Sequence, residues 1–433
     1  MKDFLDRTKI IIKKDGLWLG FALLITLMIV GFSSTSGIGN LNRSFRYTTD
    51  GLKVELGLMK EEDLFNYGKE YENKKITAEE IAESKKFYQD IIDKYDLTMA
   101  DVKEYKKSRP AEEYPQETLD KFSAIGILHQ FRSNFLGEYS DPENIFKTED
   151  LDSFDKSLDV TTYAYVILFI FAIAMLTTSL EHITPFYEFK RMFPWSRTKD
   201  FTIRLLLGAI MTGVVYAFCV LLSFAIWKTY YSSDIVSFST LGISLLKNFL
   251  RLMAFYLIAM GTGAMAGSFI GHLALMFMTG IGFSLITINL ESVMGIFYGE
   301  IFDDSIISRF NQFIQTRDRF IRTLYCPFDQ DFSFNSILAL LLISAVIVAI
   351  AYFVVAKEKE ERSGKFVLDK NISKICFVLA VFSAASVMFM MFTGILPTAG
   401  QAFVTVRLAL YLLLLYISYR LFKILFEIKM VFR

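Results

Sequence analysis

The sequence predicts an all-α fold: a polytopic membrane protein of about eight transmembrane helices, with a helical extracellular domain between the first and the second. Hydrophobic residues make up 53% of the 433 positions and charged residues only 21%, which is more apolar than ordinary soluble proteins. Apolar runs long enough to cross a bilayer recur along the chain. One polar insert, residues 37–158, separates the first run from the second.

Eight apolar runs predict the transmembrane helices. Residues 1–36 hold the first run, preceded by charged and apolar residues that suit a helix lying in the membrane interface. This run is short and follows a basic start, so a cleaved signal peptide is the alternative, with small residues for cleavage at 31–36. We favour a retained span because all later topology is that of a multi-span protein. The predicted spans are Leu17–Phe32, Val160–Leu180, Phe201–Trp227, Phe249–Gly267, Phe269–Leu290, Ile337–Ala356, Ile375–Phe392 and Phe403–Phe426.

The positions of Lys and Arg residues predict the topology. They gather before the first span, between the second and third, between the sixth and seventh, and after the last. Positively charged loops face the cytoplasm. With eight spans all four clusters fall on that side, so both termini are cytoplasmic and residues 37–158 face outward. Residues 159–356 then hold spans two to six, with a cytosolic loop at 181–200 and an outer segment at 292–334, and residues 357–433 hold a cytosolic loop and spans seven and eight.

The polar insert is predicted to be mostly helical. Thr77-Ala78-Glu79-Glu80 fits a capping box at the start of one helix, and a second helix is predicted from Gln116 through Phe131. The insert has thin apolar content, so we expect it to pack on itself and on a partner, or on the outer ends of the spans. It carries more acidic than basic groups, which argues against a nucleic-acid partner. The three cysteines are scattered and indicate no disulfide framework.

Two features accompany the fifth and sixth spans. Residues 292–334 contain apolar positions from Ile306 to Leu324 at helical spacing, which predicts an amphipathic helix on the outer leaflet. Gly263, Gly267 and Gly271 repeat every fourth residue, a spacing that permits close helix contact in lipid. This repeat runs across the predicted break near Ser268, so the boundary between spans four and five stays open.

Several chemistries are missing. There is no P-loop: Ser363-Gly364-Lys365 resembles only its end and lacks the upstream glycine. The three histidines lie far apart without companions at metal-ligand spacing, and there is no GxSxG motif or carboxylate pair. We therefore expect that the chain is not an enzyme and has no catalytic, cofactor-binding or metal-binding residues.

Charged residues are scarce within the predicted spans. No Asp or Glu lies at mid-membrane, which argues against an ion-coupled transporter. Arg204, Lys247, Arg251 and Arg407 lie near span ends, where we expect their side chains to snorkel to the interface. For Arg407 the alternative is contact with a substrate or a partner helix.

The stretch Glu181–Arg197 between the second and third spans is longer and richer than a simple turn of about five residues. Its Glu-His, Pro, Phe-Lys and Pro-x-Ser-Arg layout resembles the corresponding loop of bacterial type-2 ABC exporter permeases. A second stretch, Lys357–Phe366, resembles the Arg-x-x-Glu-Arg-Ala-Gly-Lys tail of one branch of these permeases. Here Ser363 replaces the usual alanine, and Glu358 or Lys359 stands near the expected arginine.

The resemblance implies a short coupling helix within His182–Met192 that fits a groove on an ATP-binding subunit, with Pro194 ending it. The alternative is an interfacial hairpin whose aromatic residues touch lipid, and for the second stretch a charged flank without further contact. The residues implied in ATPase coupling are His182, Pro185, Phe186, Phe189, Lys190, Arg191, Pro194, Ser196 and Arg197, with a secondary cytosolic contact at Glu361, Arg362, Gly364 and Lys365.

The resemblance also implies a function. The chain would be a multi-pass permease subunit in a bacterial cell membrane, exporting a peptide or lipid-like substrate. ATP and Mg would be bound by separate ABC ATPase subunits, and a second permease, identical or related, would complete the core in the lipid bilayer. The large insert and two extra C-terminal spans depart from the six-span family plan. The alternatives are an ABC-type mechanotransmission relay that acts on an extracellular partner without transport, and a motor-free membrane receptor or scaffold.

Overall fold

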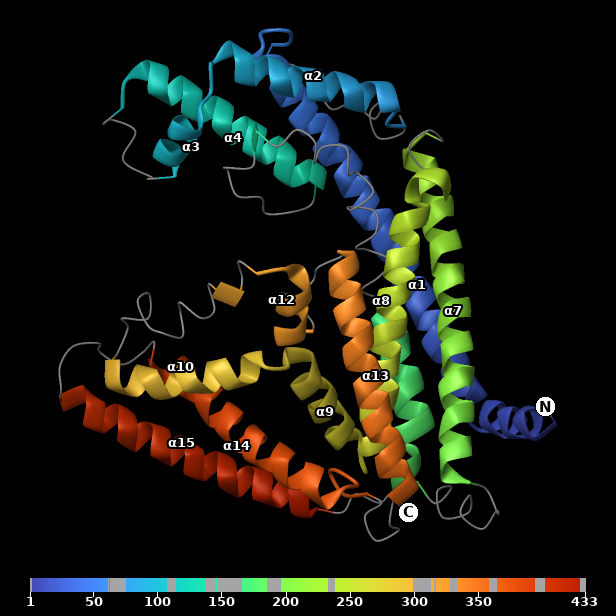
Figure 1. Ribbon diagram of the computed structural model, residues 1–433. Helices are drawn as coiled ribbons and strands as arrows, with labels where there is room; N and C mark the ends of the chain where they lie inside the picture. Colours follow the sequence, from blue (N-terminus) through green and yellow to red (C-terminus); the bar gives the residue numbers. More distant parts are fainter. Residues whose placement is uncertain are drawn as a thin grey trace. The chain divides into compact units, whose positions relative to one another are not determined.

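The computed structural model confirms the all-α class (Figure 1). Within the described part of the chain, the only β-type pairings are two isolated bridges, Ile76 with Tyr231 and Ala266 with Val367. The structure describes residues 2–60, 62, 75–106, 114–136, 145–146, 166–184, 196–232, 238–298, 313–314, 317–327, 333–357, 364–393 and 402–428.

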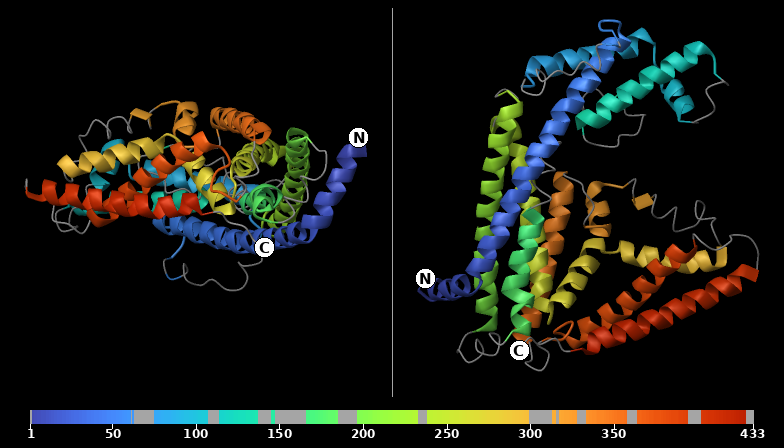
Figure 2. Two further views of the ribbon diagram at one scale, coloured as in Figure 1. Left: turned by 90° about the horizontal axis from the view of Figure 1, so that it is seen from below. Right: turned by 180° about the vertical axis from the view of Figure 1, so that it is seen from behind.

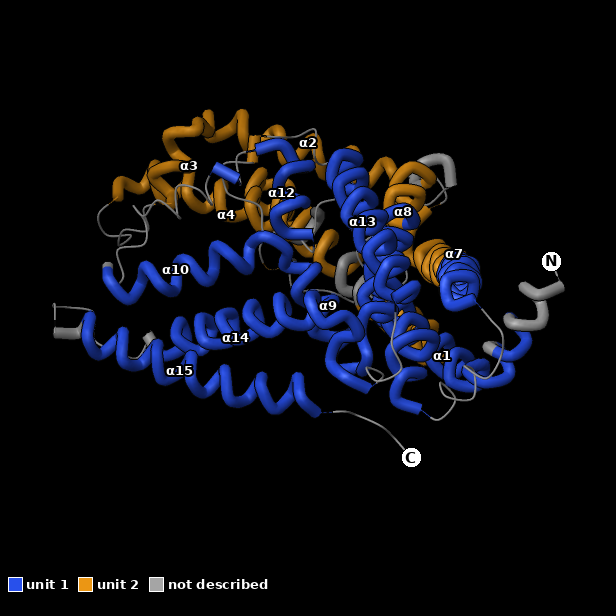
Figure 3. Tube along the Cα trace, turned by 60° about the horizontal axis from the view of Figure 1, so that its bottom comes forward, with its two compact units in different colours: residues 1–23, 167–214, 249–433 blue, residues 24–166, 215–248 orange. Residues whose placement is uncertain are grey.

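The chain divides into two compact units (Figure 3). Unit 1 contains residues 1–23, 167–214 and 249–433, and unit 2 contains residues 24–166 and 215–248. Three long helices supply residues to both units: α1 (Lys2–Glu55), α7 (Arg197–Tyr230) and α8 (Phe238–Met265).

The chain is a polytopic membrane protein with seven long apolar helices among the described residues and one bent pair of apolar helices, which has the form of a broken span or of a re-entrant loop. The predicted spans agree with these helices in order and in approximate length, and residues 160–165 of the predicted second span lie outside the described residues. The seven helices are Ile12–Ser36, Val166–Ile183, Arg197–Tyr230, Gly242–Met265, Phe334–Lys357, Lys370–Phe392 and Val404–Glu427.

The fifth span is the point where the prediction of one continuous helix is wrong. It consists of α9 (Phe269–Ile281) and α10 (Ser284–Tyr298), bent by 82°. Gly282 sits at the bend with φ of 59°, a conformation that side chains with a Cβ rarely adopt. The predicted break before this span is confirmed, because Ser268 caps α9 and its hydroxyl accepts the Gly271 N–H at 3.2 Å.

The segment predicted to hold an outer amphipathic helix is described only in part. Its first residues, up to Tyr298, continue α10. Further along, the structure describes α12 (Arg319–Tyr325), which covers the end of the predicted run from Ile306 to Leu324. Most of the residues between Tyr298 and Arg319 lie outside the described part.

The last helices of unit 1 pack closely on one another. Figure 2 shows α14 (Lys370–Thr393) and α15 (Ala402–Glu427) side by side in both views, with α10 beside them. A buried cluster joins the three helices, with Phe389 and Tyr411 edge to face at 5.4 Å. The remaining long helix of this unit, α13 (Phe334–Lys357), makes its main described contact with α12.

Unit 2 forms its own helical core. The predicted capping box is confirmed at the start of α2 (Ala78–Lys94), and a second one starts α3 (Met99–Tyr105). The predicted second helix is α4 (Gln116–Leu136). The first apolar span, Ile12–Ser36, ends near the predicted position, but the helix that contains it, α1, continues to Glu55. Its last turns contribute to this core through the Phe45–Phe131 ring contact at 6.3 Å and the Thr49–Ser84 hydroxyl pair at 3.1 Å.

Alkaline titration tests the join between α1 and α2. The Tyr95 hydroxyl donates to the Glu55 carboxylate. Burial, followed by this hydrogen bond and the Glu55 charge, raises the pKa of Tyr95 to about 12. Because the folded pKa exceeds the unfolded value of about 10, the stabilisation is complete below that pH and is lost as pH rises through the folded pKa.

We expect Glu55→Gln to shift this late phenolate absorbance to lower pH, and Tyr95→Phe to remove it. Glu83→Gln, an exposed carboxyl on α2, is the matched control and should leave the titration unchanged. If the Glu55→Gln titration curve matches the parent curve, the contact with Glu55 does not raise the pKa of Tyr95.

Candidate functional site

The structure describes both ends of the predicted coupling loop. Residues 185–195 lie outside the described part, and with them Pro185, Phe186, Phe189, Lys190, Arg191 and Pro194. Glu361 and Arg362 also lie outside it. The described members of the two predicted motifs are His182, Ser196, Arg197, Gly364 and Lys365.

The second span changes helix type just before the loop. Residues 166–174 are α-helical, Met175–Ser179 form a π-helix, and Glu181–Ile183 form a 3₁₀ turn. The Leu180 N–H reaches the Met175 carbonyl at 2.9 Å, the five-residue step of a π-helix. Such widened turns are frequent at functional sites because they redirect side chains and free a carbonyl group. Here the turn leaves Glu181 buried and His182 half-buried.

The other end of the loop enters α7. Ser196 and Arg197 are exposed. The Ser196 carbonyl accepts the Asp200 N–H at 3.0 Å, and this first turn buries the Asp200 side chain. An acidic residue in the first turn of a helix also complements the positive end of the helix dipole.

One guanidinium group joins the two ends. Arg204, which is 5% exposed, donates from Nε to Asp200 Oδ2 at 2.8 Å and from Nη2 to Glu181 Oε1 at 2.9 Å. Its Nη1 donates to the Thr177 carbonyl, within the π-helix, and also pairs with Glu181 Oε2. The rigid fork of an arginine suits two carboxylates and one carbonyl at once.

The N-terminal helix adds a second cation and a third acid. Lys14 Nζ lies 3.8 Å from Glu181 Oε1 and 3.6 Å from Asp15 Oδ1. The Asp15 side chain is buried. We call this group the loop-base cluster: Lys14, Asp15, Thr177, Glu181, Asp200 and Arg204. All six residues belong to unit 1.

The expected snorkelling of arginines near the span ends is wrong for the three that are buried. Arg204 is paired inside the protein, Arg251 lies over the Phe255 ring at 5.8 Å, and Arg407 is 6% exposed. The helical spacing of Asp200 and Arg204 was a signal of a paired charge. No such spacing connects Arg204 with Glu181, since the loop separates them.

A buried histidine continues the network behind the loop-base cluster. The His272 Nε2 atom lies 2.8 Å from the Ala259 carbonyl, which can only accept, so Nε2 carries the proton. Nδ1 then accepts the Ser179 hydroxyl at 3.0 Å, which links α9 to the π-helix. Among the described residues, no three His, Cys, Asp or Glu side chains are grouped to hold a metal ion.

The three glycines of the predicted close-contact repeat have different roles. A Cβ at Gly263 would collide with the Thr178 hydroxyl and the His272 ring, so α8 and the second span approach closely there. Gly267 lies in the break between α8 and α9, and a Cβ at Gly271 would overlap the Phe366 carbonyl. The prediction of close helix contact is confirmed at Gly263, whereas Gly271 packs on a loop.

That loop is the second predicted motif. Gly364 has φ of 80°, a backbone conformation that favours glycine over other residues. Its N–H donates to the Gly267 carbonyl at 2.9 Å. The Leu368 N–H donates to the Met265 carbonyl at 3.0 Å. Phe366 stacks on Phe426 at 4.0 Å, and Lys365 is half-buried. The second motif therefore contacts α9 and the break before it, and α9 in turn contacts the π-helix that precedes the first motif.

No family model, curated protein or solved structure matches this chain. The function is therefore inferred from the residues, their contacts and the apolar helices.

Substitution of Arg204 tests the loop-base cluster. Arg204→Gln leaves two buried carboxylates without their cation, and removing one partner of a buried ion pair costs about 3–5 kcal/mol. We expect a loss of that size in unfolding free energy, a smaller loss for Arg204→Lys, which keeps the charge without the fork, and little change for the exposed control Arg197→Gln. Equal thermal stability of the parent and Arg204→Gln in lipid nanodiscs would contradict the paired geometry.

Gly271→Ala tests the close contact with Phe366. The added methyl group must displace a backbone carbonyl, so we expect faster hydrogen exchange at the amides of Gly364 and Leu368. Gly213→Ala is the matched control, because its added Cβ would meet only side chains, the nearest at 3.7 Å. The contact is refuted if both variants exchange like the parent.

Proposed function

We propose that this chain is the permease subunit of an ABC-type transporter, driven through the 185–195 loop by separate ATPase subunits. The observation that carries the proposal is the single buried guanidinium that holds the two ends of this loop. Glu181 ends the second span and Asp200 begins the third, and both carboxylates bind Arg204. A push on the loop is thereby delivered to both spans together.

This arrangement favours a force-bearing loop over an interfacial hairpin. Burying charged groups is expensive and adds little net stability, and a hairpin that only reverses the chain needs no such group. Coupling, by contrast, requires rigid joints between the element that receives the force and the helices that move. The fixed base is the feature expected of such a joint.

The second motif supports the same proposal. Its described residues bond to the break between α8 and α9, and α9 bonds through His272 to the π-helix above Glu181. A force on either predicted cytosolic stretch would reach the same helices. ATP and Mg would be bound by the partner ATPases, and a second permease copy or a related chain would complete the core in the bacterial cell membrane. A peptide or lipid-like export substrate follows from the resemblance alone.

One observation favours a relay that moves an outer domain instead of transporting. Lys14 and Asp15 of α1 belong to the loop-base cluster, and the same uninterrupted helix ends at Glu55, whose carboxylate and carbonyl accept hydrogen bonds from Tyr95 and Lys94. A helix without a break can transmit motion along its length. This second candidate function uses the same ATPase and the same loop.

Co-purification tests the proposed motor. The full chain is expressed with each candidate ABC-class P-loop ATPase of its host. For an ATPase that co-purifies, we expect Phe189→Asp to reduce its recovery by about tenfold or more, since a charge placed in an apolar groove is costly. Phe189→Leu is the matched control and should retain binding. Undiminished recovery with Phe189→Asp would exclude the loop as the docking element, and failure of the parent chain to recover any ATPase would favour a motor-free scaffold.

Vesicle assays separate the two ATPase-driven candidates. Flux of substrate that depends on ATP supports the permease. ATP-dependent movement between labels in unit 2, with no flux, supports the relay.

A further inference from the structure

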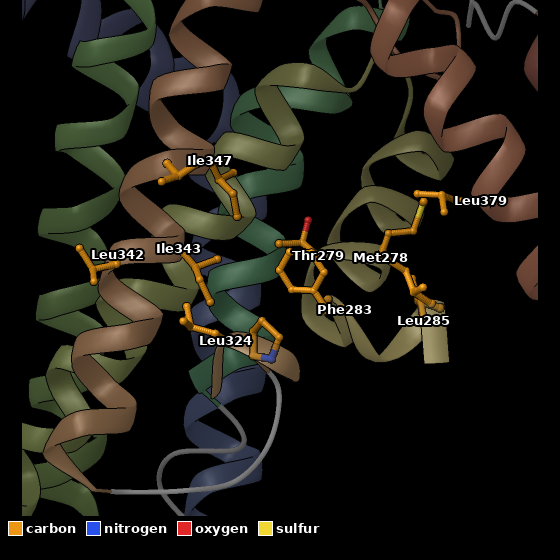
Figure 4. A pocket seen from close by; sticks show the side chains of 13 residues that line it. Met278, Thr279, Phe283, Leu285, Leu324, Leu342, Ile343, Ile347 and Leu379 are labelled. Carbon is orange, nitrogen blue, oxygen red and sulfur yellow. The ribbon is translucent and has the colours of Figure 1, made fainter. Parts of the chain in front are cut away.

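An apolar cavity lies at the elbow of the broken fifth span. Its volume is about 450 Å³, within the range of small-ligand pockets. Figure 4 shows side chains of α13 on one side and side chains of α9 and of the elbow on the other, with Leu324 of α12 and Leu379 of α14 completing the wall. We call it the elbow cavity; all of its lining belongs to unit 1.

The elbow cavity is held open by specific contacts. Gly282 is in the left-handed region, and a Cβ there would lie 2.8 Å from Pro327 Cδ and 3.0 Å from the Tyr325 carbonyl. The end of α12 therefore packs directly into the bend. Two hydroxyl pairs fix α12 further: Tyr325 with Thr287 of α10, and Thr323 with Ser336 of α13. The walls cannot close without breaking these bonds.

Two backbone amides at the elbow are bonded within the protein. The Gly282 N–H reaches the Met278 carbonyl at 3.0 Å, and the Ile286 N–H reaches the Phe283 carbonyl at 3.0 Å. Internal hydrogen bonds of this kind let backbone outside regular helix lie at membrane depth.

The lining selects an apolar occupant. It consists of Leu, Ile, Val, Met and Phe side chains with Pro327, Gly282 and Thr279. The Thr279 hydroxyl donates to the Leu275 carbonyl of its own helix at 2.7 Å. Water in a cavity requires two or more polar partners, and apolar cavities without them stay dry. A polar or charged ligand would lose its hydration without compensation.

The surroundings narrow the choice of ligand. The walls α13 and α14 are long and apolar enough to cross a membrane, and the α9–α10 pair is apolar enough for a broken span or a re-entrant loop. Around such helices the available apolar molecule is the bilayer lipid, whose chains are flexible and narrow enough to enter.

We propose that the elbow cavity is a lipid site that holds one acyl chain of a bilayer phospholipid as a resident ligand. Its head group lies outside the cavity. The bound chain fills the space between α13 and the elbow, and it supplies the dispersion contacts that an empty cavity would lack. This site is independent of the proposed ATPase coupling, because none of its residues belongs to the loop-base cluster.

Photo-crosslinking tests the site in the full chain. The protein is reconstituted in nanodiscs of phosphatidylethanolamine and phosphatidylglycerol that contain a trace of phospholipid with a diazirine on one acyl chain. After the probe lipid has loaded, we expect adducts at Met278 and Ile343 to fall slowly when excess unlabelled lipid is added, whereas adducts at the exposed Ile210 of α7 fall at once in proportion to the dilution.

Cavity-filling variants give the decisive comparison. Ile343→Trp and Leu324→Trp enter from different walls, and each should reduce the Met278 adduct by about tenfold because the indole occupies the space of the chain. Ile210→Trp, at an exposed position of α7 that does not line the cavity, should not. Two filling variants are used so that one poorly folded variant does not decide the result. The midpoint of thermal unfolding of each variant shows whether it is folded.

Two outcomes overturn the proposal. One is a Met278 adduct that is lost as fast as the Ile210 adduct after unlabelled lipid is added, which means ordinary exchange with annular lipid. The other is an unchanged Met278 adduct in both folded filling variants, which places the probe outside the cavity.

Discussion

The contact of the Arg204 guanidinium with Glu181 and Asp200 is the constraint on which the region around the loop depends. A cation buried this deeply is stable only when all of its hydrogen-bond and charge partners are in place in the fold. The widened turn of the π-helix meets this requirement, because it turns Glu181 inward and leaves the Thr177 carbonyl accessible to Arg204. The local irregularity of the second span and the charge pair therefore explain each other.

The same reasoning extends away from the charges. The π-helix places the Ser179 hydroxyl against His272, and α9 in turn has Gly271 where the Phe366 carbonyl approaches. These short-range contacts join the π-helix, α9 and the segment that contains Phe366. We attribute the rigidity of this region to its hydrogen bonds and to the glycines that let backbones approach closely. Contacts between apolar helix faces alone would allow the helices to shift more easily.

The sequence predicted what depends on local pattern. Apolar runs placed the spans, and the Thr77–Glu80 spacing placed a helix start, because both arise from neighbouring residues. It did not predict the bend at Gly282, since the residues on either side are equally apolar and the cause is the distant end of α12. It likewise missed the pairing of Arg204 with Glu181, whose spacing matches no helical period. For the candidate site, the local sequence pattern predicted the loop. The loop-base cluster could be recognised only from contacts in the three-dimensional structure.

The unbroken α1 helix has a consequence for how this chain can vary in length. Each residue added to an α-helix turns everything beyond it by about 100°. Phe45 and Glu55 both have partners within unit 2, on separate turns of one helix. A single-residue insertion between them would rotate one contact away from the other and also move it along the axis by about 1.5 Å. The number of residues between these two positions is therefore constrained in a way that a flexible connection would not impose.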